Sequence, residues 1–279
     1  MINIAVLIPN YNGAGFIRAT VDEFQKSFSG LEIIVVDDVS TDNSVSILGE
    51  SDITLLVRSA NGGFAAAVNT GLRYVVTHGI DFVLVANSDV GMTPFIADRI
   101  LSVINNLSLQ EPGVILGFQE EDDHYKESRN GDKISGFFFG LDSRIIQKVG
   151  YLDESYIMYG EEQDYFKRVE LAEFKIQQTN IVIPHEGEKS AVGSLKNSWF
   201  AIRNALKLEV KFFSLKNLVR TFCVLFLVIN RLYRPAPNHS IHRLLRPGVF
   251  MGNIFLMSAV IWNVVMLPKT LIEKKNEYK

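Results

Sequence analysis

The chain of 279 residues has a single cysteine, Cys223, so it cannot form an internal disulfide. This scarcity is typical of a reducing compartment. Two phosphate-binding fingerprints, G-x-G-x-x-G and G-x-x-x-x-G-K-[ST], are missing, which argues against the usual dinucleotide-binding and P-loop proteins. The opening stretch MINIAVLIPNYNG lacks the basic region and cleavage site of a signal peptide, and we expect it to form the first strand.

Acidic side chains are scarce at the end of the chain. Residues 1–195 hold 14 Lys and Arg against 28 Asp and Glu, whereas residues 196–279 hold 14 against 3. This asymmetry indicates an acidic catalytic body with a basic arm. Such an arm suits nucleic acid or an anionic membrane surface. Its apolar content favours the membrane, and we expect no nucleic-acid partner.

The first hundred residues alternate short apolar runs with helical patterns, which predicts an α/β fold with a mainly parallel sheet flanked by helices. The expected strands are Ile2–Pro9, Leu31–Asp38, Ile53–Ser59 and Asp81–Asp89. The expected helices are 14–28, 42–50, 63–78 and 93–106. We expect Thr41 and Asp42 to cap the second helix and Pro94 to lie in the first turn of the fourth.

The pattern is mixed from residue 113 onward. We expect strands at 113–118, 133–141 and 174–184, and helices at 143–150 and 161–172. The polar stretch 119–133 is expected to be a mobile loop.

The last third changes character at Leu195. Residues 195–213 predict a basic amphipathic helix, and the uncharged run Thr221–Asn230 is too short to cross a bilayer. Gly248–Leu267 is uncharged for twenty residues between Pro247 and Pro268, which reaches the lower range of a membrane span.

Three polar residues in this stretch, Asn253, Ser258 and Asn263, weaken the case for a membrane span, although they do not form one polar stripe. Positive charge on both flanks gives no clear orientation in a membrane. An interfacial or re-entrant helix pair explains the mixture at least as well, and we favour membrane association. The alternative is a buried helix of a C-terminal subdomain.

Polar residues follow each of the first four expected strands. Ligands of open parallel sheets bind outside the carboxyl ends of the strands, so these residues are candidates for one crevice. They are Pro9, Asn10 and Tyr11, then Asp37 and Asp38, then Asn61, Gly62 and Gly63, and finally Asn87, Ser88 and Asp89. The backbone N–H groups at the two glycines are expected to be available for a phosphate.

An ordered set of motifs carries a resemblance to a known family. In sequence order they are VLIPNYNG, VVDDVSTDNS, NGGFAAAVNTGL, VANSDV, GFFFGLDSRIIQKVGYLDESYIMYGEEQDYFKRV and WFAIRNALK. Over residues 3–207 the chain resembles family 2 glycosyltransferases with the GT-A fold, with the bacterial rhamnosyltransferase-like branch nearest. The resemblance implies a nucleotide-sugar half at 1–110 and an acceptor half at 111–210. The charge and apolar content of residues 211–279 predict a basic, apolar helical tail that associates with a membrane.

The resemblance also implies a donor site. Asp38 would read the pyrimidine ring with Asp37 as its support, and the other donor residues would be Pro9, Asn10, Tyr11, Asn61, Gly62, Gly63, Asn69, Asn87 and Ser88.

A metal site is implied as well. Asp89 would bind Mn²⁺ or Mg²⁺, and His185 resembles the distal histidine of the metal shell, the alternative being a solvated loop histidine.

For the acceptor side, the segment YGEEQDYFKR resembles the family motif that carries the catalytic base. By position the base is Glu162, with Glu161 and Asp164 as rivals. The alternative is an acidic first turn that complements the helix dipole.

The resemblance implies an inverting transferase, and the processive Gln-x-x-Arg-Trp segment is missing, so one sugar per visit is expected. The donor would be a nucleoside diphosphate sugar such as dTDP-rhamnose or a UDP-sugar. The acceptor would be a glycan or a polyprenyl-linked molecule. The protein itself is expected at the cytoplasmic face of the cell membrane, bound peripherally or through a short C-terminal insertion. A homo-oligomer is possible.

Two other classes stay open. One is a nucleotidyltransferase, and the other is a non-catalytic binding protein on a degraded transferase scaffold, suggested by Asn87 and Glu162, which depart from the family pattern.

Overall fold

The structure is a computed structural model that describes residues 2–49, 51–107, 113–121, 134, 136–185, 195–212, 215–232 and 249–277. Its contacts divide the chain into two compact units. The first comprises Met1–Glu154 and Tyr165–Ser190, and the second comprises Ser155–Asp164 and Ala191–Lys279. The functional division at 110 and 210 stays a prediction.

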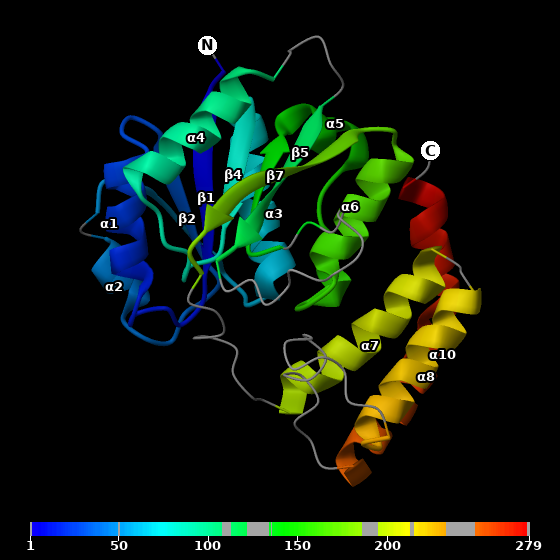
Figure 1. Cartoon of the computed structure of the whole chain (residues 1–279). Coiled ribbons are helices and arrows are strands. Elements are labelled where there is room, and N and C mark those ends of the chain that lie inside the picture. Colours follow the sequence, from blue (N-terminus) through cyan, green and yellow to red (C-terminus); the bar gives the residue numbers. More distant parts are fainter. Residues whose placement is uncertain are drawn as a thin grey trace. The chain divides into compact units, whose positions relative to one another are not determined.

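The first unit is built on a seven-stranded sheet (Figure 1). The strands are β1 (Ile4–Asn10), β2 (Glu32–Asp37), β3 (Thr54–Val57), β4 (Phe82–Ala86), β5 (Val114–Glu120), β6 (Phe138–Asp142) and β7 (Lys175–Ile183). They are ordered β3-β2-β1-β4-β6-β5-β7, and among the described strands β6 alone runs antiparallel to its neighbours. The expected mainly parallel sheet is confirmed.

Helices cover both faces of this sheet, which is why the central strands are apolar on both faces. The helices are α1 (Ile17–Ser27), α2 (Ser44–Leu48), α3 (Gly63–Thr77), α4 (Pro94–Asn105), α5 (Ser143–Val149) and α6 (Glu161–Leu171). One core cluster joins α1 and α4 to one face of the sheet, and a second joins α3, α5 and the end of α6 to the other. Every residue of β1, β4 and β6 is buried, as expected for strands between two helical layers.

Two local expectations differ from the structure. Helix α2 begins at Ser44, and its N-cap is Asn43. The Asp42 carboxylate nevertheless accepts from the amide of Ser44, the first residue of α2, at 3.0 Å, and from the Ala14 amide at 2.9 Å. It therefore satisfies one N-terminal N–H of the helix, as expected, and ties that end to the loop after β1. The expected mobile loop begins later than 119, because β5 continues to Glu120, and residues 122–133 lie outside the described residues.

The parallel arrangement gathers the carboxyl ends of six strands at one edge of the sheet. Strands β1, β2, β3, β4, β5 and β7 all run in the same direction, and the residues that follow them come together there. We call this edge the strand-end edge. It is the expected location of a ligand site in an open α/β sheet.

The second unit contains three long helices, α7 (Leu195–Phe212), α8 (Leu215–Ile229) and α10 (Val249–Glu277). They share a small core that includes Ile202, Leu225 and Leu256. Of the expected stretch, residues 249–267 are helical, and Gly248 lies outside the described residues; α10 continues past this stretch through Pro268. A proline inside a helix removes one N–H donor, and here the hydroxyl of Thr270 donates to the Met266 carbonyl in the same turn.

The polar residues of α10 face the other helices. Asn253 exchanges hydrogen bonds with Asn230, the residue after α8, and Ser258 accepts from the Trp199 indole of α7. The amide of Asn263 donates to the Arg203 carbonyl. Because these three side chains make hydrogen bonds toward two different helices, they do not have to lie in one polar stripe along α10. They do not interrupt the apolar, outward-facing surface of α10.

Three basic side chains of the expected basic amphipathic helix, α7, are turned inward. Arg203, Lys207 and Lys211 are each at most 3% exposed. They contribute to the count of positive charge in the last third but not to a surface that could attract an anion.

The outer surfaces of α8 and α10 are largely apolar. Val249–Thr270 has a mean hydropathy of 1.9 and is long enough to cross a membrane, a test that core helices of soluble proteins also pass. Only 22% of its most apolar window is buried. The exposed apolar side chains of the two helices are Leu215, Val219, Phe222, Phe226, Leu227, Val249, Phe250, Met251, Ile254, Met257, Ile261, Val264, Val265 and Leu267.

Candidate functional site

Asp37, at the end of β2, is a buried carboxylate with its own set of donors. The side-chain amide of Asn10, at the end of β1, donates to it at 2.9 Å. The amide and hydroxyl of Ser40 donate to it at 2.8 and 2.6 Å. Asn10 therefore ties β1 to β2, and Asp37 fixes the turn that follows β2.

Asp38 is buried beside it and takes a different set of donors. Its carboxylate pairs with the Arg58 guanidinium at 2.8 Å and accepts from the amides of Gly62 and Gly63. The two glycine amides, expected to be available for a phosphate, are therefore already hydrogen-bonded to Asp38. A base that contacts Asp38 has to share the carboxylate with these donors or displace one of them.

Arg58 was missed in the sequence because it follows β3 alone, without a motif. Its guanidinium also donates to the Thr70 hydroxyl at 2.9 Å and to the Ala66 carbonyl in α3. It therefore fixes the start of α3 against β3 and neutralises the second of the two adjacent aspartates. The sequence feature that could have predicted a cation at this site is the adjacent pair Asp37 and Asp38, because two neighbouring negative charges require a cation or hydrogen-bond donors nearby.

The remaining predicted donor-site residues differ in exposure and in hydrogen-bond partners. Tyr11 is 48% exposed just after β1, whereas Pro9 is buried within it. The Asn61 amide donates to the Asp38 carbonyl. Asn87 and Ser88 are partly buried after β4, where the Ser88 carbonyl accepts from Thr20.

Asn69 is placed differently from the rest. It is 1% exposed in α3, and its side-chain amide bonds to the backbone of Leu152 and to Glu154. Its polar atoms are used inside the fold, and its predicted role in donor binding stays a prediction.

His185 lies between two carboxylates at the strand-end edge. Its Nε2 is 3.1 Å from Asp89 Oδ1, after β4, and its Nδ1 is 2.7 Å from Glu120 Oε1, at the end of β5. The ring stacks on Phe137 with centroids 4.9 Å apart. Burial lowers the pKa of His185, but the hydrogen bonds to the two carboxylates outweigh it and raise this pKa to about 9.

These contacts place His185 against protein groups rather than in a solvated loop. Glu120 was missed because it stands in the polar stretch expected to be a loop. The sequence feature that could have identified Glu120 is that it is the first acidic residue after an apolar strand.

The Asp89–His185 pair can be tested as a place for a divalent cation. Among the described residues, no group of three or more His, Cys, Asp and Glu side chains is placed to hold a metal. Two protein ligands with water and phosphate oxygens nevertheless suit Mg²⁺ or Mn²⁺. Adjacent ligands of an octahedral ion with bonds of about 2.1 Å lie about 3 Å apart. The Asp89 and His185 atoms, at 3.1 Å, fit that spacing.

In the second unit, a strained loop precedes the predicted catalytic segment. Ile157, Tyr159 and Gly160 all have positive φ, at 66°, 66° and 92°. For residues with a Cβ this conformation costs about 1–2 kcal/mol each and requires support from the surroundings.

Helix α7 supplies that support. The Asn204 amide donates to the carbonyls of Tyr156, Met158 and Tyr159 at 2.7–3.0 Å. The Arg203 guanidinium donates to the carbonyls of Ser155 and Tyr156. The motif WFAIRNALK therefore holds the loop that carries GEEQD.

The acidic residues after this loop have three different environments. Asp164 is fully buried and pairs with Lys211 at 2.8 Å while accepting from the Tyr156 hydroxyl. Glu161 is 4% exposed, and burial and the nearby Glu162 raise its pKa well above its ordinary value. Glu162 is half-buried, and burial raises its pKa as well. These environments favour a structural role for Asp164.

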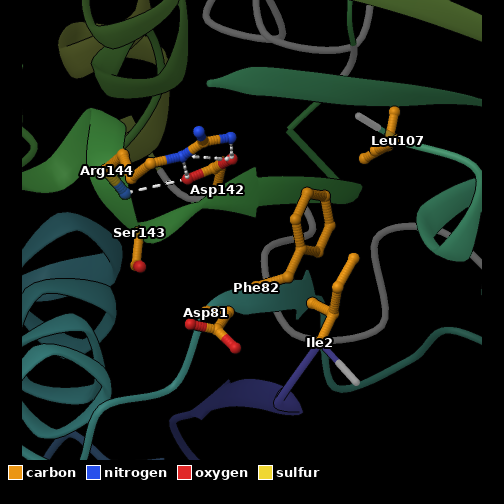
Figure 2. A pocket seen from close by; sticks show the side chains of 7 residues that line it. All are labelled: Ile2, Asp81, Phe82, Leu107, Asp142, Ser143 and Arg144. Carbon is orange, nitrogen blue, oxygen red and sulfur yellow. Dashed lines mark hydrogen bonds and ion pairs between the residues drawn. The ribbon is translucent and has the colours of Figure 1, made fainter. Parts of the chain in front are cut away.

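A hollow of about 210 Å³ lies at the other end of β4 and is unrelated to the strand-end edge (Figure 2). Its polar groups are used locally. The Asp142 carboxylate caps α5 through the Arg144 amide and pairs with the Arg144 guanidinium at 2.6 Å. We assign it no ligand.

We predict that Asp164→Asn destabilises the protein by about 3–5 kcal/mol, because it removes the carboxylate that pairs with the buried Lys211 ammonium at 2.8 Å. Chemical unfolding measures this change. Glu170→Gln in the same helix is the matched control. It removes an exposed ion pair with Lys167 and should cost less than about 1 kcal/mol. Equal losses in the two variants would contradict the assignment.

We also predict that Glu161 makes the stability of the protein depend on pH. A carboxyl with a raised folded-state pKa costs stability as the pH rises above its unfolded value, here 4.5, because only the unfolded chain ionises freely. The free energy of unfolding of Glu161→Gln, relative to that of the native protein, should therefore increase with pH from about pH 4.5 upward. The increase should be at most about 1.4 kcal/mol per pH unit. Parallel stability curves between pH 4 and 8, measured by urea unfolding, would refute this.

Sequence comparison identifies the chain's relatives. An uncharacterised glycosyltransferase of Rickettsia prowazekii is 26% identical over 174 residues, which cover 54% of this chain and 54% of that protein. The glycosyltransferase GlyA of Streptococcus pneumoniae is 35% identical over 85 residues, covering 29% of this chain and 12% of that protein. The chain thus matches only about half the length, or less, of these curated relatives.

Solved structures with a similar fold include a mannosyltransferase. The mannosyltransferase of Pyrobaculum calidifontis, in complex with GDP-Man and Mn²⁺, gives a TM-score of 0.57 at 17% identity, over 94% of this chain and 75% of that one. Staphylococcus aureus TarS gives 0.55 at 16%, over 85% and 44%. Glucosyl-3-phosphoglycerate synthase of Mycobacterium tuberculosis, with Mg²⁺ and UDP, gives 0.54 at 15%, over 74% and 78%.

These likenesses confirm the expected GT-A-like fold. The model of the family described as "Glycosyl transferase family 2" matches residues 5–161, more than half of the chain. The chain belongs to glycosyl transferase family 2.

Proposed function

We propose that the protein is a metal-dependent, inverting and non-processive glycosyltransferase. It moves one sugar from a nucleoside diphosphate donor to a hydroxyl of a lipid-linked or polysaccharide acceptor, in the synthesis of a surface glycan. The donors to test first are dTDP-rhamnose, from the resemblance in the sequence, and the GDP- and UDP-linked sugars that the structural neighbours bind.

The strand-end edge of the sheet supports this proposal most strongly. It brings Asp89 and His185, which are separated by 96 residues in the chain, to 3.1 Å from each other. The same edge carries the Asp37–Asp38 pair after β2. A nucleotide site next to a cation site is the arrangement that a nucleoside diphosphate sugar requires.

Each residue has a proposed role in the reaction. Asp38, Asn10 and Tyr11 bind the nucleoside, and Asp89 and His185 hold the divalent ion. The carboxylate of Glu162 accepts the proton of the acceptor hydroxyl. The acceptor oxygen then bonds to the anomeric carbon while the bond from that carbon to the diphosphate oxygen breaks, and the nucleoside diphosphate leaves with the electron pair. The bound ion supplies positive charge that stabilises the departing diphosphate.

The raised pKa of Glu162 suits this role. Burial makes the ionised carboxylate less favourable, so that it takes up a proton more readily than an exposed glutamate does. A base with a pKa closer to neutral is a better proton acceptor at physiological pH.

We predict that the protein is stabilised against heat by one nucleoside diphosphate in the presence of Mn²⁺, and that turnover of the matching sugar releases the free nucleoside diphosphate. Glu162→Gln should lower kcat by about 10²–10⁴-fold while leaving donor binding nearly unchanged. Glu170→Gln, on the same helix, should retain full activity.

Each other outcome has a clear meaning. Release of pyrophosphate would point to a nucleotidyltransferase. If no donor binds or is hydrolysed, the chain is a non-catalytic binding protein. If Glu161→Gln rather than Glu162→Gln abolishes turnover, the base is one residue earlier.

We also propose that α8 and α10 dock on the cytoplasmic face of the cell membrane, either lying on it or inserting briefly. Their exposed surfaces are apolar over most of their length. Lys216, Arg220 and Arg231 are exposed on or next to α8, where they suit anionic headgroups. A second copy of the chain is the other candidate for covering these surfaces.

We predict that the full chain floats with vesicles and does so more completely when phosphatidylglycerol is added to phosphatidylcholine. Phe250→Ser, which changes a side chain that is 79% exposed on α10, should reduce flotation. Phe95→Ser is the matched control, because Phe95 is 72% exposed but lies on α4 of the first unit. A protein that stays in solution as a stable dimer would contradict membrane docking.

A further inference from the structure

We propose that Glu120 is a positioning residue for the metal site. Its carboxylate holds His185 in one tautomer and one orientation, so that Nε2 is presented to a divalent cation that is shared with Asp89. This inference rests on the metal site of the proposed function and adds a residue to it that no motif identified.

The His185 ring is held on three sides by three separate segments. Glu120 contacts Nδ1 at 2.7 Å from the end of β5, and Asp89 faces Nε2 at 3.1 Å after β4. Phe137, just before β6, stacks on the face of the ring at an interplanar angle of 24°. A backbone bridge between Val90 and His185 fixes the main chain beside it.

The position of Glu120 is fixed by the sheet as well. It is the last residue of β5, and it pairs in register with Ile183 of β7, two residues before His185. The amide of the following residue, Glu121, donates to the Ile183 carbonyl at 3.0 Å. Glu120 and His185 are therefore brought together by strand pairing rather than by a mobile loop.

The chemistry of imidazole explains what this contact does. A neutral imidazole has one N–H donor and one acceptor nitrogen, and an ionised carboxylate can only accept. Glu120 therefore keeps a proton on Nδ1. The proton on Nε2, which faces Asp89 at 3.1 Å, is the one that a divalent cation would replace. A carboxylate in this place also makes the histidine a stronger ligand.

Glu120 is not itself placed as a ligand. It contacts the ring nitrogen opposite the one that faces Asp89, so the three side chains do not converge on one point. This agrees with the finding that no three such side chains among the described residues are placed to hold a metal. The side chain of Glu120 is also the most exposed of the three, at 31% against 11% for His185 and 8% for Asp89.

Mn²⁺ binding to the purified full chain tests the proposal without any assay of activity. The free ion is counted by electron paramagnetic resonance at constant pH. We expect Glu120→Ala to weaken Mn²⁺ binding about 10- to 100-fold. Glu120→Gln should lose less, because its side-chain oxygen can still accept from Nδ1. Glu121→Gln is the matched control and should bind as the native protein does, since Glu121 is an exposed neighbour of the same charge.

A double-mutant cycle separates positioning from simple loss of negative charge. If Glu120 acts through His185, Glu120→Ala should have no further effect in a protein that already carries His185→Ala. An equal loss in both backgrounds, or a loss in Glu121→Gln of the same size, would show that Glu120 acts by charge alone and would overturn the proposal. Native affinity in Glu120→Ala would do the same.

Failure of this proposal and failure of the proposed function give different results. If the native protein binds Mn²⁺ and transfers sugar but Glu120→Ala binds Mn²⁺ normally, only the role of Glu120 is wrong. If the native protein binds no Mn²⁺ and turns over equally well with a chelator, the metal site itself is wrong, and the role of Glu120 falls with it.

Discussion

The adjacent carboxylates Asp37 and Asp38 are the constraint on which the strand-end edge depends. Two buried like charges next to each other are unfavourable unless each has its own donors. Asp37 takes them from β1 and from the turn after β2, and Asp38 takes them from Arg58 after β3 and from the start of α3. Satisfying the two charges therefore aligns three strand ends and the first turn of a helix, which prepares this edge for a ligand.

The same rule explains two other buried charges among the described residues. His185 is placed between two carboxylates, and Lys211 is buried with Asp164. In both places the partners come from segments that are distant in the chain, so each pair fixes a tertiary contact. Breaking such a pair leaves an uncompensated charge, which costs more than the pair itself contributes. The chemistry of the protein is thus concentrated where its fold is least tolerant of change.

Local patterns in the sequence were sufficient to predict the strands and the parallel sheet, because buried parallel strands are continuous apolar runs. They also placed Asp37, Asp38 and Asp89 after strands. They did not reveal Arg58 or Glu120, because each is a single charged residue whose partner is a carboxylate or a histidine far away in the sequence. The uncharged stretch Gly248–Leu267 was bounded in the sequence by Pro268, but α10 continues through this proline to Glu277.

The basic tail shows most clearly why charge counts mislead. The last third has eleven more basic than acidic residues, by the difference of 14 and 3, which suggested an arm for anionic partners. Three of those cations, on α7, are buried. Arg203 lies over the rings of Trp199, Phe200 and Trp262 and, like Lys207, contacts the segment before the acidic residues of α6. Their positive charge serves the fold. The described outward side chains of α8 and α10 are instead largely apolar. The membrane docking proposed above would therefore draw mainly on buried hydrocarbon area, with the exposed Lys216, Arg220 and Arg231 as a smaller electrostatic addition.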